Sequence, residues 1–317
     1  MSLLQKQVFA LAGPTASGKT NLAIKLAKEI DAEIISVDST LVYKGLDIGS
    51  AKPTIKEMQG IYHHLIDIID PWLSYSVNDF LIDVQSLIID IQARNKNVLL
   101  VGGTMMYFKA LEEGISILPE ANEATRAQLK EKTLTYWYDF LQHADPVTAV
   151  RLNPADRQRI ERAVEIILLT NKPYSIVIQQ NKKQGGLGQR LTICALVPQD
   201  RKKLHDDIDK RFHKMLDAGF LHEVKQLKEN PKINENLPAM RSVGYRQAWQ
   251  YLEGQYDYQA FIDKGIAATR QLAKRQLTWI RNWPYQLKAI DTSLMDKEKL
   301  EQIISYLYSK CPTKTYP

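Results

Sequence analysis

A glycine-rich loop near the beginning of the chain restricts the possible folds more than any other feature. Residues 13–20 read Gly-Pro-Thr-Ala-Ser-Gly-Lys-Thr and fit the pattern G-x-x-x-x-G-K-[ST] without a mismatch. An apolar segment, residues 7–12, precedes this loop, and a helical pattern, residues 21–29, follows it. Such a loop between a strand and a helix is typical of a phosphate-binding P-loop. The sequence therefore predicts an α/β domain built around it.

The expected ligand of this loop is a phosphate group. Inward-pointing backbone N–H groups and the start of a helix attract phosphate oxygens. Lys19 can reach the terminal phosphates as a point charge, and the Thr20 hydroxyl can bind a Mg²⁺ ion that bridges them. We therefore expect Mg²⁺ as cofactor, with Thr20 as its protein ligand. The expected phosphate-binding residues are Gly13, Pro14, Thr15, Ala16, Ser17, Gly18, Lys19 and Thr20.

Further short apolar segments predict a doubly wound parallel sheet. Residues 33–37 and 98–101 read as strands, and residues 191–197 return as another strand after a long helical stretch. The remainder, from residue 201 onwards, is mostly helical in pattern. The expected fold is a P-loop α/β sheet with a helical insertion domain and a helical C-terminal region. Its expected parts are residues 1–118 (first part of the core), 119–188 (helical insertion) and 189–317 (core completion and helical C-terminal region).

An acidic residue follows the second predicted strand. Asp38 comes directly after residues 33–37, at the sheet edge where doubly wound proteins bind ligands. We expect its carboxylate to face the phosphate loop, as a general base or as a water-mediated Mg²⁺ contact, with a helix N-cap as the alternative. The strand of residues 98–101 ends instead in Gly102, so it lacks the acid that ATP hydrolysis normally requires.

Several basic stretches suit RNA. The chain has a formal net charge of +6. Gln158, Arg159 and Arg162 share one face of a predicted helix, although a solvated helix face is the alternative. In residues 241–246, two arginines flank a glycine and a tyrosine, a pattern suited to gripping a backbone and stacking on a base. Residues 264–288 hold six basic residues, no acidic one and three interleaved aromatics. This combination suits RNA, with a core-packed aromatic helix as the alternative.

The overall sequence favours a cytoplasmic protein. No apolar run is long enough to cross a bilayer, and residues 1–7 show no signal-peptide pattern. Two isolated cysteines form neither a disulfide framework nor a zinc site. We expect a monomer with no membrane partner.

Together these features resemble the bacterial tRNA dimethylallyltransferase (isopentenyl-tRNA transferase) family, nearly from end to end. The ordered matches are residues 13–20, 38–39, 42–43, 45–53, 63–67, 102–104, Tyr107, 109–111, 158–159, Arg162, 211–212 and 241–246. The resemblance implies transfer of a dimethylallyl group from its pyrophosphate to N6 of the adenosine 3′-adjacent to the anticodon. It also implies Mg²⁺, release of pyrophosphate, and two partners, dimethylallyl pyrophosphate and the tRNA anticodon stem-loop.

The resemblance also implies roles for parts of the chain and for individual residues. The helical insertion, residues 119–188, is implied to contact the tRNA anticodon loop, and the helical C-terminal region within residues 189–317 is implied to bind tRNA. The loop resembles the pyrophosphate cradle, with Lys19 and Thr20 catalytic, Asp38 resembles the base that accepts the N6 proton, and Arg211 resembles a second pyrophosphate clamp. The implied tRNA contacts are Asp38, Ser39, Thr40, Leu41, Thr104, Arg126, Gln158, Arg159, Ile160, Glu161, Arg162, Arg241, Ser242, Val243, Gly244, Tyr245 and Arg246. Leu41 departs from the family pattern Asp-Ser-x-Gln, so a polar contact near the modified base is absent.

Other functions share the phosphate loop. An ATP-dependent small-molecule kinase is one alternative, and the missing acid after residue 101 counts against it. An adenylate isopentenyltransferase acting on a free nucleotide is another. The helical insertion and the basic C-terminal third favour tRNA over a free nucleotide. A non-catalytic RNA-binding protein would not need an intact phosphate loop opposite Asp38.

Overall fold

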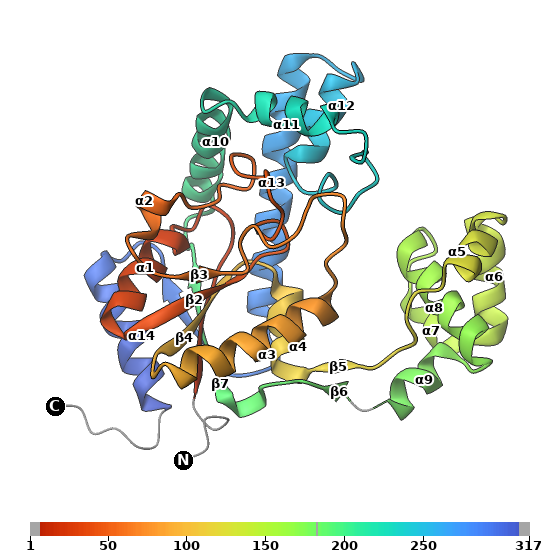
Figure 1. Cartoon of the computed structure of the whole chain (residues 1–317), viewed down its shortest axis with the longest axis horizontal. Coiled ribbons are helices and arrows are strands. Elements are labelled where there is room, and N and C mark those ends of the chain that lie inside the picture. Colours follow the sequence, from red (N-terminus) through yellow and green to blue (C-terminus); the bar gives the residue numbers. More distant parts are fainter. Residues whose placement is uncertain (1–6, 182, 311–317) are drawn as a thin grey trace. The chain divides into compact units, whose positions relative to one another are not determined.

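A parallel β-sheet forms the centre of the larger of two structural units in the computed structural model, which describes residues 7–181 and 183–310 (Figure 1). The sheet unit comprises Met1–Glu112 and Leu187–Pro317, and the helical unit comprises Glu113–Gly186. All strand pairs of the six-stranded sheet are parallel. Its strand order is β3 (His63–His64), β2 (Ala32–Val37), β4 (Asn97–Gly102), β1 (Val8–Ala12), β7 (Leu191–Val197) and β8 (Leu287–Asp291).

Helices cover both faces of this sheet. Ile34 of β2 packs in one cluster with buried residues of α1 (Lys19–Glu29) and α14 (Asp296–Ser309). Glu33, one position earlier, points to the opposite face, because successive strand residues alternate. There it accepts hydrogen bonds from Arg94, the residue that ends α3 (Val77–Ala93). The sheet is therefore doubly wound, and the predicted P-loop α/β fold is confirmed.

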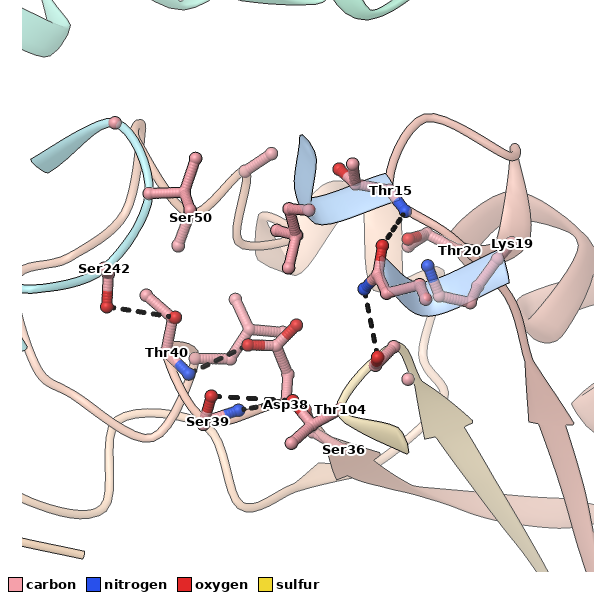
Figure 2. Close-up of a pocket in the computed structure, with 18 of the residues that line it drawn as sticks. Thr15, Lys19, Thr20, Ser36, Asp38, Ser39, Thr40, Ser50, Thr104 and Ser242 are labelled. Carbon is pink, nitrogen blue, oxygen red and sulfur yellow. Dashed lines mark hydrogen bonds between the residues drawn. The ribbon is translucent and has the colours of Figure 1, made fainter. Parts of the chain in front are cut away.

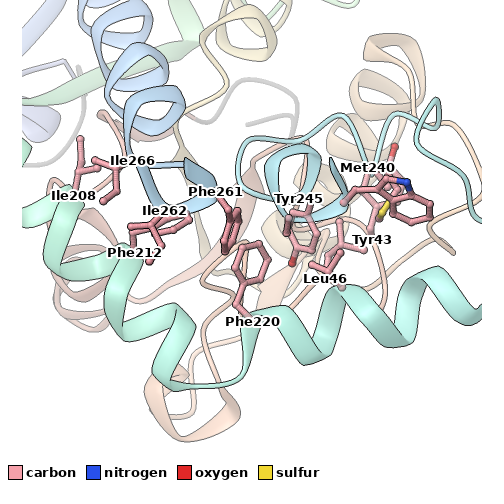
Figure 3. Packing of buried hydrophobic residues seen from close by; sticks show 14 of the residues in the cluster. Tyr43, Leu46, Ile208, Phe212, Phe220, Met240, Tyr245, Phe261, Ile262 and Ile266 are labelled. Atoms are coloured by element: carbon pink, nitrogen blue, oxygen red, sulfur yellow. The ribbon is translucent and has the colours of Figure 1, made fainter. Parts of the chain in front are cut away.

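A second hydrophobic core lies among the later helices of the sheet unit. It joins α10 (Arg201–Asp217), α11 (Phe220–Glu229), α12 (Tyr245–Leu252) and α13 (Tyr258–Arg281). Phe220 packs edge-to-face against Tyr245, with ring centroids 5.2 Å apart, and Phe212 contacts both Phe220 and Phe261 (Figure 3). Shorter helices α2 (Ile55–Met58) and α4 (Met105–Glu113) complete the elements before the insertion.

The helical unit has a small core of its own. Trp137, Leu141, Ile160 and Val164 are buried at its centre, and the Trp137 indole N–H donates to the Leu129 carbonyl at 2.8 Å. Its helices are α5 (Glu123–Lys130), α6 (Leu134–Ala144), α7 (Pro146–Arg151), α8 (Arg157–Thr170) and α9 (Tyr174–Gln180). Short strands β5 (Ile115–Ser116) and β6 (Lys183–Gln184) pair antiparallel.

The structure differs from the sequence-based expectations in three places. The helical unit, Glu113–Gly186, begins earlier than residue 119 and ends earlier than residue 188, the expected bounds of the insertion. The β5–β6 pair belongs to this unit, which explains the earlier start. Strand β6 lies where only helices were expected, and β8 lies in the C-terminal region expected to be mostly helical. Both strands are short, and three of the five β8 positions are charged or exposed, so they lack an apolar pattern. None of the helices in the described part of the chain is both long and apolar enough to span a membrane.

Candidate active site at the carboxyl edge of the sheet

A cavity of about 540 Å³ lies at the carboxyl ends of β2 and β4, beside the phosphate loop. Thr15, Lys19 and Thr20 line it from the loop, and Asp38 lines it from the end of β2. Arg211 of α10 also lines it. The structure therefore brings the four residues expected to be catalytic to one cavity within the sheet unit. Figure 2 shows three of them, Lys19, Thr20 and Asp38.

The phosphate loop presents polar groups that lack protein partners or have weak ones. The Ser17 hydroxyl is buried and has no hydrogen-bond partner. The Lys19 ammonium donates to the Pro14 carbonyl at 3.2 Å, a contact that closes the loop on itself. An anion in the loop would supply acceptors for both groups, since phosphate oxygens accept several hydrogen bonds.

Two cations and one carboxylate shape the electrostatics of the cavity. Burial, together with the positive charge of nearby Arg211, lowers the pKa of Lys19 to about 8, although Asp38 acts in the opposite direction. Burial also lowers the pKa of Arg211, again opposed by Asp38. The partly buried positive charges of Lys19 and Arg211 thus lie close to the negative charge of Asp38, and the exposed side chains of Arg241 and Arg275 also line the cavity. Such a site is stabilised when a polyanion enters.

Asp38 is held in place by the turn that follows β2. The backbone N–H of Thr40 donates to Oδ1 of Asp38 at 2.8 Å in a turn rather than at the start of a helix, so the helix N-cap alternative is wrong. The neighbouring N–H of Ser39 donates to the Thr104 hydroxyl at 3.2 Å. One Asp38 oxygen therefore fixes the carboxylate, and the side chain still faces the cavity (Figure 2).

The end of β4 explains why no acid follows this strand. A Cβ atom on Gly102 would collide with the Val37 carbonyl of the neighbouring strand. Thr104, two positions later, lines the cavity and contacts both Ser39 and the Val37 carbonyl. Close packing of the two strand backbones therefore requires glycine at position 102, so no catalytic carboxylate stands there.

Gln276 of α13 is a site residue that sequence reasoning missed. Its Oε1 accepts from the Thr15 backbone N–H at 2.9 Å, and its Nε2 donates to the Gly103 carbonyl at 3.0 Å. The side chain joins the phosphate loop to the end of β4. A single glutamine inside a basic helical stretch gives no sequence signal for this role. The same helix places Arg275 and Trp279 at the cavity, whereas Trp283 is buried.

The segment 241–246 divides into cavity-lining and buried parts. Arg241, Ser242, Val243 and Gly244 line the cavity, and Ser242 accepts a hydrogen bond from the Thr40 hydroxyl at 3.3 Å. Arg246 is exposed and is not among the lining residues. The other expected tRNA contacts of the sheet unit, Ser39, Thr40, Leu41 and Thr104, also line the cavity.

The expected contact of Tyr245 with a base is wrong. Its side chain is fully buried in the second core, and its hydroxyl donates to Glu223 at 2.6 Å. Because helix α12 begins at Tyr245, the side chain points into the helical layer while the preceding residues face the cavity.

In the helical unit, the expected tRNA contacts lie on α5 and α8. Gln158 and Arg159 are exposed on α8, and Arg159 pairs with Asp156 at 3.4 Å. The guanidinium groups of Arg126 and Arg162 both contact the buried carboxylate of Glu165. These arginines therefore have a structural partner in the absence of RNA.

Two further expected tRNA contacts, Glu161 and Ile160, also lie on α8. Glu161 accepts a hydrogen bond from Arg157 at 2.7 Å on the same helix face. The expected contact of Ile160 is wrong, because its side chain is fully buried in the core of the helical unit. Its inclusion followed from its place between polar neighbours, whereas the helical period directs it inward.

The donor groups in the cavity fit a Mg²⁺ ion that is bound together with a phosphate substrate. Within residues 7–181 and 183–310, no group of three His, Cys, Asp or Glu side chains could hold a metal alone. Mg²⁺ commonly takes only one or two protein oxygens plus phosphates and waters. The Thr20 hydroxyl and the Asp38 carboxylate, which both line the cavity, match that requirement.

The fold and the cavity define a P-loop α/β protein with a polar, basic cavity beside the loop. The model of the IPP transferase family matches residues 41–283. The tRNA dimethylallyltransferase of Francisella philomiragia is 53% identical over 307 residues, covering 96% of this chain and 99% of that protein. Its Francisella tularensis counterpart is 54% identical over 299 residues, covering 93% and 97%. The chain therefore belongs to the IPP transferase family.

Solved structures agree with this assignment. A tRNA isopentenylpyrophosphate transferase from Bacillus halodurans is 34% identical with a TM-score of 0.71, covering 96% of each chain. A eukaryotic dimethylallyltransferase described as acting on tRNA is 26% identical with a TM-score of 0.83, covering 98% of this chain and 81% of that one. None of these relatives favours the kinase alternative.

Proposed function

We propose that this protein is a tRNA dimethylallyltransferase. It transfers a dimethylallyl group from dimethylallyl pyrophosphate to N6 of the adenosine 3′-adjacent to the anticodon, and it releases pyrophosphate. The observation that carries this proposal is that one cavity holds the phosphate loop, the partly buried cations Lys19 and Arg211, and Asp38. The names of relatives more than half identical to the chain supply the acceptor class.

Leaving-group stabilisation is the first task of the site. An allylic pyrophosphate loses its leaving group readily, so negative charge develops on the pyrophosphate in the transition state. The backbone N–H groups of the loop, the Lys19 ammonium and the Arg211 guanidinium would interact with that charge. Bound Mg²⁺, held by Thr20, would add Lewis-acid stabilisation of the same oxygens.

Proton removal is the second task. The exocyclic amine of adenine is a poor nucleophile because its lone pair is delocalised into the ring. When N6 bonds to the allylic carbon, it must lose a proton, and a carboxylate within hydrogen-bond reach can accept it. Asp38 has one oxygen held by the Thr40 N–H, which leaves the other available for N6.

Access of the adenine is the third task. A base inside a stacked anticodon loop cannot reach a recessed carboxylate, so it must swing out into the cavity. The turn of residues 38–41 and the segment 241–244 line the cavity around Asp38 and would surround that base. The exposed side chains of Gln158 and Arg159 on the helical unit would contact the RNA backbone.

The proposal is tested by mapping the product on the RNA. Purified protein is incubated with tRNA lacking the modification, dimethylallyl pyrophosphate and Mg²⁺, and nuclease fragments are analysed by mass spectrometry. One dimethylallyl group should appear on the adenosine that follows the anticodon. Replacement of this adenosine by guanosine should abolish the product. Equal labelling of free adenosine monophosphate would instead support a nucleotide-specific isopentenyltransferase.

A further inference from the structure

The cavity wall near Asp38 includes a loop with little secondary structure of its own. This wall loop, residues 45–53, contributes Gly49, Ser50, Ala51 and Pro53 to the cavity. Figure 2 shows Ser50 together with Ser242 and Thr40 on one side of the cavity, and Thr15 and Lys19 on the other. The wall loop is therefore part of the side that would receive the acceptor base.

A buried carboxylate on α11 holds this loop. Glu223 accepts hydrogen bonds from three successive backbone N–H groups, those of Asp47 at 3.0 Å, Ile48 at 2.6 Å and Gly49 at 3.1 Å. Its side chain is 9% exposed. Consecutive N–H groups that converge on one carboxylate form an anion-binding nest, which fixes the backbone conformation strongly.

The same carboxylate also contacts the start of α12, next to the cavity-lining residues 241–244. Oε1 of Glu223 also accepts from the Tyr245 hydroxyl at 2.6 Å. Burial, followed by the charge of Glu223, raises the pKa of Tyr245, so this hydroxyl remains a neutral donor. Tyr245 directly follows the cavity-lining residues 241–244, so Glu223 joins the wall loop to the start of α12.

The packing behind the wall loop permits little adjustment. A side chain on Gly49 would collide with the Phe220 ring, and its Cβ would lie only 2.7 Å from Cζ of Tyr245. These two aromatic rings belong to the second core and pack against each other (Figure 3). The loop backbone therefore lies directly on the core, and its position is set by Glu223 on one side and by the two rings on the other.

We infer that Glu223 is a positioning residue that shapes the acceptor side of the cavity, and thereby controls how tRNA is used in the proposed reaction. This inference rests on the proposed function. Glu223 touches no substrate; it acts through the backbone of residues 47–49 and through Tyr245. Loss of the Glu223 charge releases the wall loop. It leaves the phosphate loop unchanged, because none of the hydrogen bonds of Glu223 involves residues 13–20.

The test compares E223Q with a matched control, E229Q, which alters an exposed glutamate on the same helix. A glutamine offers one accepting oxygen where the carboxylate offers two, and its NH₂ group opposes the N–H donors. E223Q should raise KM for tRNA about tenfold, since small displacements of a binding wall have effects of that order. Calorimetry with inorganic pyrophosphate should give the same affinity and stoichiometry for both variants.

A second variant reaches the same loop by a different route. G49A introduces a collision with Phe220 and should reproduce the increase in KM for tRNA with Glu223 intact. Y245F removes one of the four hydrogen-bond donors to Glu223 and should raise KM for tRNA by less than E223Q does. A different result for E223Q would overturn the inference. If KM were unchanged, and kcat fell only in proportion to the fraction of protein that still binds pyrophosphate, Glu223 would affect stability alone.

The remaining outcomes are also decisive. Equal KM values for E223Q and E229Q, or a normal KM for G49A, would contradict the inference. Failure of the proposed function is a separate result, because it would appear as the absence of prenylated tRNA with the unaltered protein.

Discussion

The side chain of Gln276 holds the backbone of Thr15 in the phosphate loop. The Thr15 N–H donates to Oε1 of Gln276 at 2.9 Å, although 261 positions separate the two residues. The amide orientation is fixed because Nε2 must donate to the Gly103 carbonyl. A helix of the C-terminal region thus completes a loop near the beginning of the chain.

Replacement of Gln276 should weaken pyrophosphate binding. In Q276A, the Thr15 N–H and the Gly103 carbonyl both lose their partner, and an unmade buried hydrogen bond costs about 1–3 kcal/mol. We expect the Kd of inorganic pyrophosphate, measured by calorimetry, to rise about tenfold or more. Q271A removes an exposed glutamine from the same helix and serves as the control. If both variants bind pyrophosphate equally, Gln276 does not shape the loop.

Pyrophosphate affinity should depend on the protonation of Lys19. Its pKa is lowered to about 8 in the free protein, and only the protonated form attracts the anion. The anion favours that form, so affinity should be highest below pH 8. Above this value it should fall by up to about tenfold per pH unit as one proton is lost. The measurement is pyrophosphate Kd between pH 7 and 9.

K19R is the control for this dependence, because arginine stays charged throughout that range. Titration of the pyrophosphate itself affects both proteins equally. An identical decline in K19R would assign the pH dependence to the ligand rather than to Lys19.

Replacement of Asp38 should impair proton removal but not RNA binding. D38N retains an oxygen that can accept from the Thr40 N–H, but it cannot accept the N6 proton. We expect kcat for prenyl transfer to fall by about 10²-fold or more, with tRNA affinity nearly unchanged. D31N alters an exposed aspartate just before the other end of β2 and should keep normal activity. Wild-type kcat in D38N would exclude a role as base.

The exposed arginines of both units should contribute to the salt dependence of tRNA binding. Arg159 and Arg246 are exposed, and each phosphate contact adds about 0.7–0.9 to the slope of log K against log salt. R159A and R246A should each lower the slope by that amount in filter-binding titrations. Arg162 is less suitable, because its removal also takes a partner from the buried Glu165. Unchanged slopes in both variants would leave only solvated surface arginines.

The sequence predicted those parts of the site whose position follows from the order of neighbouring strands, loops and helices along the chain. A strand, a glycine loop and a helix must place residues 13–20 at the carboxyl edge of the sheet, and Asp38 follows the next strand at that edge. The residues that sequence reasoning missed act over long separations. Glu223 contacts a loop about 175 positions away, and Gln276 contacts Thr15 across 261 positions. No local pattern marks such pairs.

The errors at Tyr245 and Ile160 have a related cause. Both residues stand among polar neighbours, and a contiguous motif was treated as one surface. A helix presents only part of a motif to one side, so the intervening apolar residues turn inward. In this protein they form part of the second core and of the helical unit's core.

We propose that the phosphate loop binds an allylic pyrophosphate as the reacting substrate, with no role for ATP hydrolysis. The most direct measurement uses unmodified tRNA, dimethylallyl pyrophosphate and Mg²⁺ with the purified protein and no added nucleotide. Prenylated adenosine and released pyrophosphate are counted in the same reaction. We expect one pyrophosphate for each modified adenosine, and no product with K19A, which should still bind tRNA. A strict requirement for ATP, with one ATP hydrolysed per turnover, would contradict this proposal.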